Sequence, residues 1–418
     1  MSVENLSLEK RIFILSKTYS LINSYFVHWQ DAPNVDLDEL YRDTIPKVIE
    51  NDNPYDFFLT MLQFLASLNN GHTTYIDLDF LPFNRGNLGF KFRKINRQWV
   101  ITNSHIDSLN MGDIIEEIDG IKVDDYYEKL KGFIFATGER GRIHRFSTLS
   151  FLFPLEFPIT LEGGKSVPIN QKENLKRKVS EEVTGKWIEK GKVAIIKISN
   201  FSNPNMENTA LEFVENFFKS DTIILDLREN RGGSTPIKLT RKLMNKPYKW
   251  WSESTKLKYG IFNFRYKQYS EMLDTSKDED DKQYLKGALQ ILQSFNNAQM
   301  LWHSEINQPS DDSYQGKVII LTDGFTVSAG EDFVMPFKDN GRATIVGETT
   351  QGSTGQPYKY DFDEKRFVIV GAKRAYFPDG TPFEGIGIKP DIEVKPVIDD
   401  LKDGKDTVLD YVLNNLLS

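Results

Sequence analysis

The sequence predicts an α/β protein made of three consecutive segments. Apolar residues recur at helical spacing over residues 1–78, short alternating strands fill residues 79–169, and buried-strand runs alternate with helices over residues 170–418. A chain of 418 residues is also too long for one typical hydrophobic core. We therefore expect a helical cap, a β-rich domain and an α/β domain, in that order.

Composition narrows the classes of function. The net charge of -8 offers no positive field for a phosphate backbone, so nucleic acid is not an expected partner. The chain has no cysteine, and its five histidines form no close pair, so no disulfide, metal site or other cofactor is expected. No stretch approaches the roughly twenty apolar residues of a membrane span. We expect a cytoplasmic protein, or an exported one whose signal peptide was removed. The oligomeric state stays open.

The N-terminal segment is expected to be helical. Apolar residues recur near helical spacing over residues 6–26 and again over residues 56–68. Gly71 is expected to end the second run, and His72 follows directly. A single histidine after a helix is usually a cap or core residue, so its position alone assigns no function.

The middle segment alternates apolar and polar residues in short runs, which predicts strands. Residues 112–123 (GDIIEEIDGIKV) indicate a strand, a tight turn and a second strand. This segment resembles a PDZ domain, because Leu88, Gly89 and Phe90 match its carboxylate-binding loop and residues 112–123 contain its recurrent hairpin. The resemblance implies that a peptide C-terminus binds near Gly89 and pairs with a strand edge. A β-rich spacer without a ligand is the alternative.

Ser328 lies where a predicted strand turns into a helix. Residues 318–333 (VIILTDGFTVSAGEDF) consist of a β-branched apolar run, a turn at Asp323 and Gly324, and a helix that begins at Ser328. Free helix N–H groups at such a turn are able to hold the oxyanion that forms when the hydroxyl attacks a carbonyl. An ordinary N-cap serine is the alternative.

A second predicted strand ends in a glycine pair. Residues 222–227 are a buried-strand run, and Gly232 and Gly233 follow shortly after it. Because glycine lets the backbone approach a ligand, we expect both strand ends to meet at one crevice. The oxyanion donors would be the Ala329 amide and the amide of Gly232 or Gly233.

Four motifs occur in the order found in one peptidase family. LDLRENRGG, LTDGFTVSAGEDF, IVGETTQGSTGQ and EGIGIKPDIEV follow the PDZ-like segment. Together they resemble the C-terminal processing peptidases, or tail-specific proteases, over about residues 65–396. The similarity looks closest to the branch that includes the tricorn core protease and the interphotoreceptor retinoid-binding protein. It implies a crotonase-like catalytic domain.

The resemblance also implies which group is the base. The processing peptidases proper use a lysine at the place that here holds Ser353, whose hydroxyl is not basic near neutrality. The tricorn-like branch uses a histidine after the helical cap, oriented by a glutamate, and these match His72 and Glu384. The implied triad is therefore Ser328, His72 and Glu384. No catalytic role is assigned to Ser353.

We therefore predict a serine peptidase that forms an acyl-enzyme and processes the C-termini of proteins or peptides. Its expected partner is a peptide or an unfolded protein. Glu348 and Glu331 are alternatives to Glu384 as the acid. Two other functions stay open: a noncatalytic peptide- or lipid-binding protein on the same scaffold, and acyl-CoA chemistry in which paired amides stabilise a thioester enolate.

Overall fold

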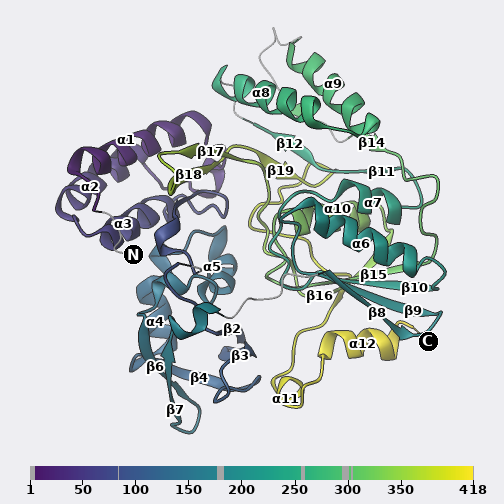
Figure 1. The fold of residues 1–418 in the computed structure, drawn as a ribbon, viewed down its shortest axis with the longest axis horizontal. Coiled ribbons are helices and arrows are strands. Elements are labelled where there is room, and N and C mark those ends of the chain that lie inside the picture. Colours follow the sequence, from purple (N-terminus) through teal and green to yellow (C-terminus); the bar gives the residue numbers. More distant parts are fainter. Residues whose placement is uncertain are drawn as a thin grey trace.

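The computed structural model contains three regions that follow one another along the chain (Figure 1). The first is mainly helical, the second is built on an antiparallel sheet, and the third is built on a mostly parallel sheet. The expected mixture of α and β structure is confirmed. The structure describes residues 5–82, 84–176, 183–255, 259–293, 301–302 and 305–417.

Three helices open the chain, and each begins after a side chain that accepts helix N–H groups. Ser7, Asp36 and Asn53 are these N-cap residues, and Pro54 follows Asn53 at the first helical position. None of the helices in the described ranges is long and apolar enough to cross a membrane. The three helices are α1 (Leu8–Tyr25), α2 (Leu37–Glu50) and α3 (Pro54–Ala66).

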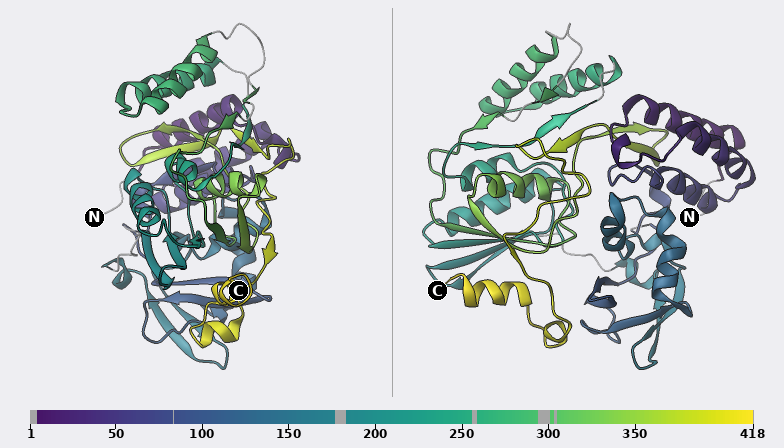
Figure 2. Two further views of the ribbon diagram at one scale, coloured as in Figure 1. Left: turned by 90° about the vertical axis from the view of Figure 1, so that its right-hand side faces the viewer. Right: turned by 180° about the vertical axis from the view of Figure 1, so that it is seen from behind.

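A small three-stranded sheet joins the helical region to residues 357–371 of the third region (Figure 2). β1 pairs antiparallel with β18, so that Thr74 lies opposite Ile369, and β17 pairs with the other side of β18. This pairing anchors the residues just before β1, and His72 is one of them. The strands are β1 (Thr74–Asp77), β17 (Pro357–Asp361) and β18 (Arg366–Gly371).

The second region is an antiparallel sheet in the order β2-β3-β4-β6-β7, with β5 paired to β4. α5 packs against β2 and α4 against β4. Apolar side chains of this region and of the helical region share one hydrophobic core. The strands are β2 (Phe90–Ile95), β3 (Gln98–Ser104), β4 (Ile114–Ile118), β5 (Ile121–Lys122), β6 (Glu156–Leu161) and β7 (Ser166–Asn170). The helices are α4 (Val123–Leu130) and α5 (Gly138–Phe146).

The third region is built on a sheet in the order β20-β16-β15-β10-β9-β8, parallel except for β8. Its four central strands, β9, β10, β15 and β16, are mostly apolar because both faces are covered. Ile319 and Leu321 pack with Val408 and Val412 of α12, whereas Ile320 belongs to the core under α6, α7 and α10. The strands are β8 (Val183–Glu189), β9 (Val193–Ile198), β10 (Thr222–Asp226), β15 (Lys317–Thr322), β16 (Ala343–Gly347) and β20 (Ile392–Glu393).

Helices cover this sheet, and short strands form two further small sheets, β11-β14 and β13-β12-β19. α8 and α9 form a helical pair that projects beyond β12 and β14 (Figure 1). The helices are α6 (Pro204–Asn216), α7 (Ile237–Leu243), α8 (Tyr259–Thr275), α9 (Glu279–Gln293), α10 (Ala329–Asp339), α11 (Ile398–Lys402) and α12 (Thr407–Asn415). The short strands are β11 (Tyr248–Lys249), β12 (Ser252–Ser254), β13 (Leu301–Trp302), β14 (Ile306–Asn307) and β19 (Arg374–Tyr376).

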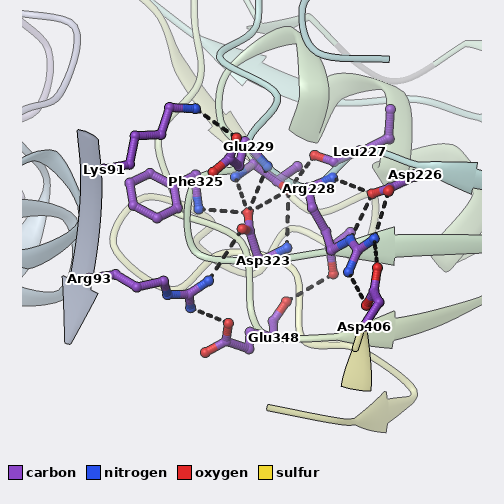
Figure 3. Close-up of polar contacts among 12 residues, drawn as sticks. Lys91, Arg93, Asp226, Leu227, Arg228, Glu229, Asp323, Phe325, Glu348 and Asp406 are labelled. Carbon is purple, nitrogen blue, oxygen red and sulfur yellow. Dashed lines mark hydrogen bonds and ion pairs between the residues drawn. The ribbon is translucent and has the colours of Figure 1, made fainter. Parts of the chain in front are cut away.

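Ionised side chains connect the second region to the third (Figure 3). Lys91 of β2 lies 2.7 Å from Glu229. Arg93 of the same strand pairs with Asp323 at 3.5 Å and also with Glu348. The side chains of Arg93 and Asp323 are only 7% and 6% exposed, so water screens this pair poorly. The contact therefore joins two regions through a nearly dry ion pair.

The carboxylate of Asp323 also holds the turn that leads to Ser328. Its Oδ1 accepts hydrogen bonds from the backbone N–H groups of Glu229 at 3.1 Å, Phe325 at 2.9 Å and Thr326 at 3.1 Å. Burial raises the pKa of Asp323, and the charge of Arg93 opposes that rise. One carboxylate thus connects β2 to the end of β15.

Substitution of Arg93 by methionine should lower the free energy of unfolding by about 3 kcal/mol, because it leaves the carboxylates of Asp323 and Glu348 without their buried partner. Lys94→Met is the matched control in the same strand, since Lys94 pairs with Asp124 near the surface. It should change stability by no more than about 1 kcal/mol. Urea denaturation of both variants measures the difference, and equal losses would contradict the expectation.

Candidate active site

Ser328 lies at a strained turn between β15 and α10. Its backbone has φ 56° and ψ -124°, a positive φ that L-residues rarely adopt and that costs about 1–3 kcal/mol. The Ser328 N–H donates to the Ser353 carbonyl at 3.0 Å and to Oε2 of Glu331 at 3.2 Å. These bonds help to hold the turn. They leave the Ser328 hydroxyl free to contact a group from outside the helix.

The imidazole of His72 is that group. Its Nε2 lies 3.2 Å from the Ser328 Oγ, although the two residues are 256 positions apart in the chain. On the other side of the ring, Nδ1 lies 2.9 Å from the Ser353 Oγ. A proton on Nδ1 that is donated to Ser353 leaves Nε2 as an acceptor for the hydroxyl of Ser328.

The turn before His72 differs from the one expected. Asn69, with φ 50°, adopts the positive φ after the helix, whereas Gly71 was expected to end it. Gly71 is required for another reason: a Cβ there would lie 2.7 Å from the Ser353 Oγ. The Gly71 N–H donates to the Thr137 hydroxyl at 3.0 Å, which anchors the turn to the segment before α5.

The sequence had led us to expect a direct hydrogen bond between Glu384 and His72, but the structure connects them only indirectly. Among the described residues, no hydrogen bond joins the two, and the Ser353 hydroxyl holds Nδ1. Thr137 bridges the gap, with its Oγ1 3.3 Å from the Ser353 Oγ and 3.4 Å from Oε2 of Glu384. Glu384 therefore lies at the end of a row of hydroxyls.

Two residues of this row were missed in the sequence. Ser353 was visible as the residue at the lysine position, but a serine cannot act as that base, so its hydrogen bond to His72 went unassigned. Thr137 belongs to no recognised motif. Thr137 could not be found from the sequence, because 216 positions separate it from Ser353 and 247 positions separate it from Glu384. Only the folded structure brings these residues together.

The two other glutamates considered as the acid, Glu348 and Glu331, have different partners. Glu348 pairs with Arg93 in the contact between regions. Glu331 is completely buried and hydrogen-bonds to Ser328 and to the loop that carries Ser353. Within the described ranges, no hydrogen bond connects either glutamate to the imidazole.

Burial shifts the pKa values of the base and the acid in opposite directions. Burial is the largest cause that lowers the pKa of His72 to about 3, and the neighbouring Arg145 and His28 contribute to the same decrease. Burial raises the pKa of Glu384 well above its usual range, although the Thr354 N–H, which donates at 3.2 Å, opposes this rise. At neutral pH the imidazole is therefore uncharged, and its Nε2 is able to accept a proton from Ser328.

Of the glycine pair, Gly232 lies against Ser328, whereas the space beside Gly233 is filled by the backbone of Phe201 and Ser202. A Cβ at Gly232 would lie 2.6 Å from the Ser328 Cβ, so only glycine fits. The Gly232 N–H already donates to Oδ1 of Asn230 at 2.9 Å. In the part of the chain that the structure describes, no hydrogen bond occupies the N–H of Gly233 or of Ala329. These two amides are the available donors.

The three residues expected to bind a peptide lie in the second region. Leu88 and Phe90 are 2% and 5% exposed. The Gly89 N–H donates to Oδ1 of Asn87 at 3.0 Å, and the Asn174 amide lies over Gly89 so closely that a Cβ there would be 2.5 Å from its Nδ2. The Gly89 N–H, which was expected to receive a carboxylate, is thus engaged within the chain. Peptide binding by these residues stays a prediction.

Residues 192–394, which include the Gly232 loop and Ser328, match the family described as Peptidase family S41. The matched residues make up just under half of the chain, so this similarity concerns the part that carries the Ser328 turn. The expected resemblance to the C-terminal processing peptidases is thereby confirmed.

The curated proteins that this chain resembles have low sequence identity to it. A probable CtpA-like serine protease of Staphylococcus aureus (strain COL) is 22% identical over 394 residues, which cover 91% of this chain and 64% of that protein. The tricorn protease of Thermoplasma acidophilum is 30% identical over 112 residues, or 25% of this chain and 10% of that protein. The chain spans less than two thirds of the length of these curated relatives.

The fold has a counterpart among solved structures. Mature CPAF complexed with lactacystin superposes with a TM-score of 0.72 at 15% sequence identity, and the match covers 98% of each chain. At this identity the similarity concerns the fold alone. Nearly the whole chain therefore has the architecture of a known structure.

The His72 imidazole should stay neutral far below its usual titration range, because burial and the nearby Arg145 disfavour the charged form. Nuclear magnetic resonance of labelled histidine rings, with a His72→Gln variant to assign the signal, measures its titration. The midpoint is expected at about pH 3. A midpoint near the unperturbed value of about 6.5 would contradict this electrostatic description.

Proposed function

We propose that the protein is a serine peptidase that cleaves peptide bonds with Ser328 as the nucleophile and His72 as the base. The observation that carries this proposal is the 3.2 Å contact between the Ser328 Oγ and Nε2 of His72 at a turn with positive φ. Such a turn exposes a hydroxyl in front of a helix N-terminus. The similarity of residues 192–394 to Peptidase family S41 supports the same chemistry.

The reaction begins when the Ser328 Oγ attacks the carbonyl carbon of a peptide bond and transfers its proton to Nε2 of His72. The negative charge of the tetrahedral intermediate falls on the carbonyl oxygen, where the N–H groups of Ala329 and Gly233 are its donors. His72 then gives the proton to the leaving amine, and an acyl-enzyme remains. Water, deprotonated by His72, hydrolyses this ester and restores Ser328.

The Ser353, Thr137 and Glu384 side chains orient the imidazole in this scheme. Because burial disfavours the imidazolium that forms during proton transfer, a hydrogen bond from Nδ1–H to the Ser353 Oγ stabilises it where water is excluded. Thr137 lies between the Ser353 hydroxyl and the Glu384 carboxyl group and connects the two. The triad acid therefore acts on His72 through two hydroxyls.

The substrate we propose is the C-terminal part of a protein or peptide. We assign residues 1–78 to a helical cap, residues 79–169 to a PDZ-like domain and residues 170–418 to a crotonase-like catalytic domain. The position of β2 at the end of the strand order supports pairing of a peptide with that edge, beside Leu88, Gly89 and Phe90.

Substitution of Ser328 by alanine should abolish labelling by a fluorophosphonate probe and lower peptide cleavage by about 10⁴-fold or more, because the nucleophile is gone. Ser220→Ala is the control, since its buried hydroxyl contacts Tyr314, a neighbour outside the Ser328 and His72 cluster. Digestion of a defined peptide mixture, followed by sequencing of the fragments, measures activity and cleavage position together. A wild-type protein that is neither labelled nor active, yet captures peptides, would instead indicate a binding protein.

Substitution of Ser353 by alanine should lower kcat about tenfold, which corresponds to one lost hydrogen bond to the imidazole. Substrate binding should change little, so KM is the internal reference. Steady-state kinetics on a fluorogenic peptide measure both constants, with Ser220→Ala as the matched loss of a hydroxyl. An unchanged kcat would remove Ser353 from the proposed row of hydroxyls.

A further inference from the structure

Glu331 is a buried carboxylate that the reaction as described does not use. It lies in the first turn of α10 and is 0% exposed. Its two oxygens accept four hydrogen bonds, from the Ser328 N–H at 3.2 Å, the Thr350 Oγ1 at 2.5 Å, the Gly352 N–H at 2.6 Å and the Ser353 N–H at 3.0 Å. Each of its partners is therefore a donor.

These bonds connect the two loops that flank His72. One loop carries Ser328, whose hydroxyl faces Nε2, and the other carries Ser353, whose hydroxyl faces Nδ1. The Ser328 N–H also donates to the Ser353 carbonyl, so the loops are in direct contact at this point. Because the turn at Ser328 is strained, its geometry depends on contacts from its surroundings. Glu331 supplies contacts to both loops at once.

The arrangement requires the ionised form of the side chain. A carboxylate is an acceptor only and has about four lone-pair sites, which matches the four donors around Glu331. A protonated carboxyl group carries its own O–H, which would face one of these donors and break that contact.

The electrostatics around Glu331 place this change close to physiological pH. Burial raises the pKa of Glu331 to about 7, against the lowering effect of its four donors. The titratable groups that act on it are Arg140 and Arg145 of α5 and the buried carboxyl group of Glu384. Since the pKa of His72 is about 3, protonation of the imidazole does not produce a change near neutrality.

We propose that Glu331 is a positioning residue: its ionised carboxylate holds the Ser328 turn and the Ser353 loop in register on either side of His72, and its protonation disorganises the site. The inference rests on the proposed peptidase function for its kinetic consequence. Its structural consequence, the protection of three loop amides, does not depend on catalysis. In the active enzyme, kcat falls as the pH drops through the titration of Glu331.

The test replaces Glu331 by glutamine, which cannot ionise and turns an NH₂ group toward N–H donors. For a fluorogenic peptide from about pH 5 to about pH 9, wild-type kcat should fall on the acid side with a midpoint near 7. Glu331→Gln should have a kcat at least about tenfold lower at high pH, an unchanged KM and no such acid-side fall. A variant that keeps the wild-type acid-side fall would overturn the proposal.

Glu207→Gln is the matched control. The Glu207 carboxylate also accepts a hydrogen bond from a helix N–H, that of Leu239 at 3.0 Å, and burial also raises its pKa, but it belongs to α6 and touches neither loop. This control should keep the wild-type kcat and the wild-type pH profile. Equal effects of both substitutions would indicate a general loss of stability and would count against a positioning role.

A second variant tests the proposal if Glu331→Gln folds poorly. Thr350→Val removes one donor that lowers the pKa of Glu331, so the acid-side fall of kcat should move to higher pH. A midpoint that stays at the wild-type value would contradict the assignment of this titration to Glu331.

Hydrogen exchange separates this inference from the peptidase function. In Glu331→Gln, amides in residues 326–332 and 350–356 should exchange faster than in wild type, whereas in Glu207→Gln they should not. If wild-type protein cleaves no peptide and Ser328 takes no fluorophosphonate, the peptidase proposal fails, but faster exchange in these two segments still supports the positioning role. Unchanged exchange overturns that role whether or not the protein is active.

Discussion

The contact of one imidazole with two hydroxyls is the interaction on which the candidate site depends. The two nitrogens of His72 face Ser328 and Ser353, which lie 256 and 281 residues further along the chain. The pairing of β1 with β18 holds the segment next to His72 in place, and Gly71 allows the backbone to approach Ser353. Strand pairing and close packing thus create the site together.

Burial sets the pKa values of the titratable groups in this site. Removal from water lowers the pKa of His72 and raises those of Glu384 and Glu331, so each group is driven toward its uncharged form. A row of hydroxyls can join such groups without an ion pair, because each hydroxyl both donates and accepts. The low dielectric that disfavours charge also strengthens these hydrogen bonds.

The turn before Ser328 is supported from two directions. Asp323 holds three backbone N–H groups of the neighbouring loops and pairs with Arg93 of the second region. Glu331 holds the other end of the turn from within α10. A strained backbone conformation persists where its surroundings determine it more than once, and these two carboxylates do so here.

The sequence by itself determined the α/β class, the buried strands that end near Gly232 and Ser328, and the helix after Ser328. These features follow from hydrophobic periodicity and turn residues, which are properties of neighbouring positions. Family resemblance added His72, and the structure brings its ring to Ser328.

Only the tertiary structure decided which side chain contacts Nδ1 of the His72 ring. Ser353 holds Nδ1, Thr137 follows, and Glu384 lies beyond them, although the motif suggested direct contact. The same holds for Asn69, which adopts the positive φ expected at a glycine, and for the Gly89 N–H, which is engaged by Asn87. Hydrogen bonds form or fail over fractions of an ångström, and packing between distant segments sets those distances. No local pattern of residues contains that information.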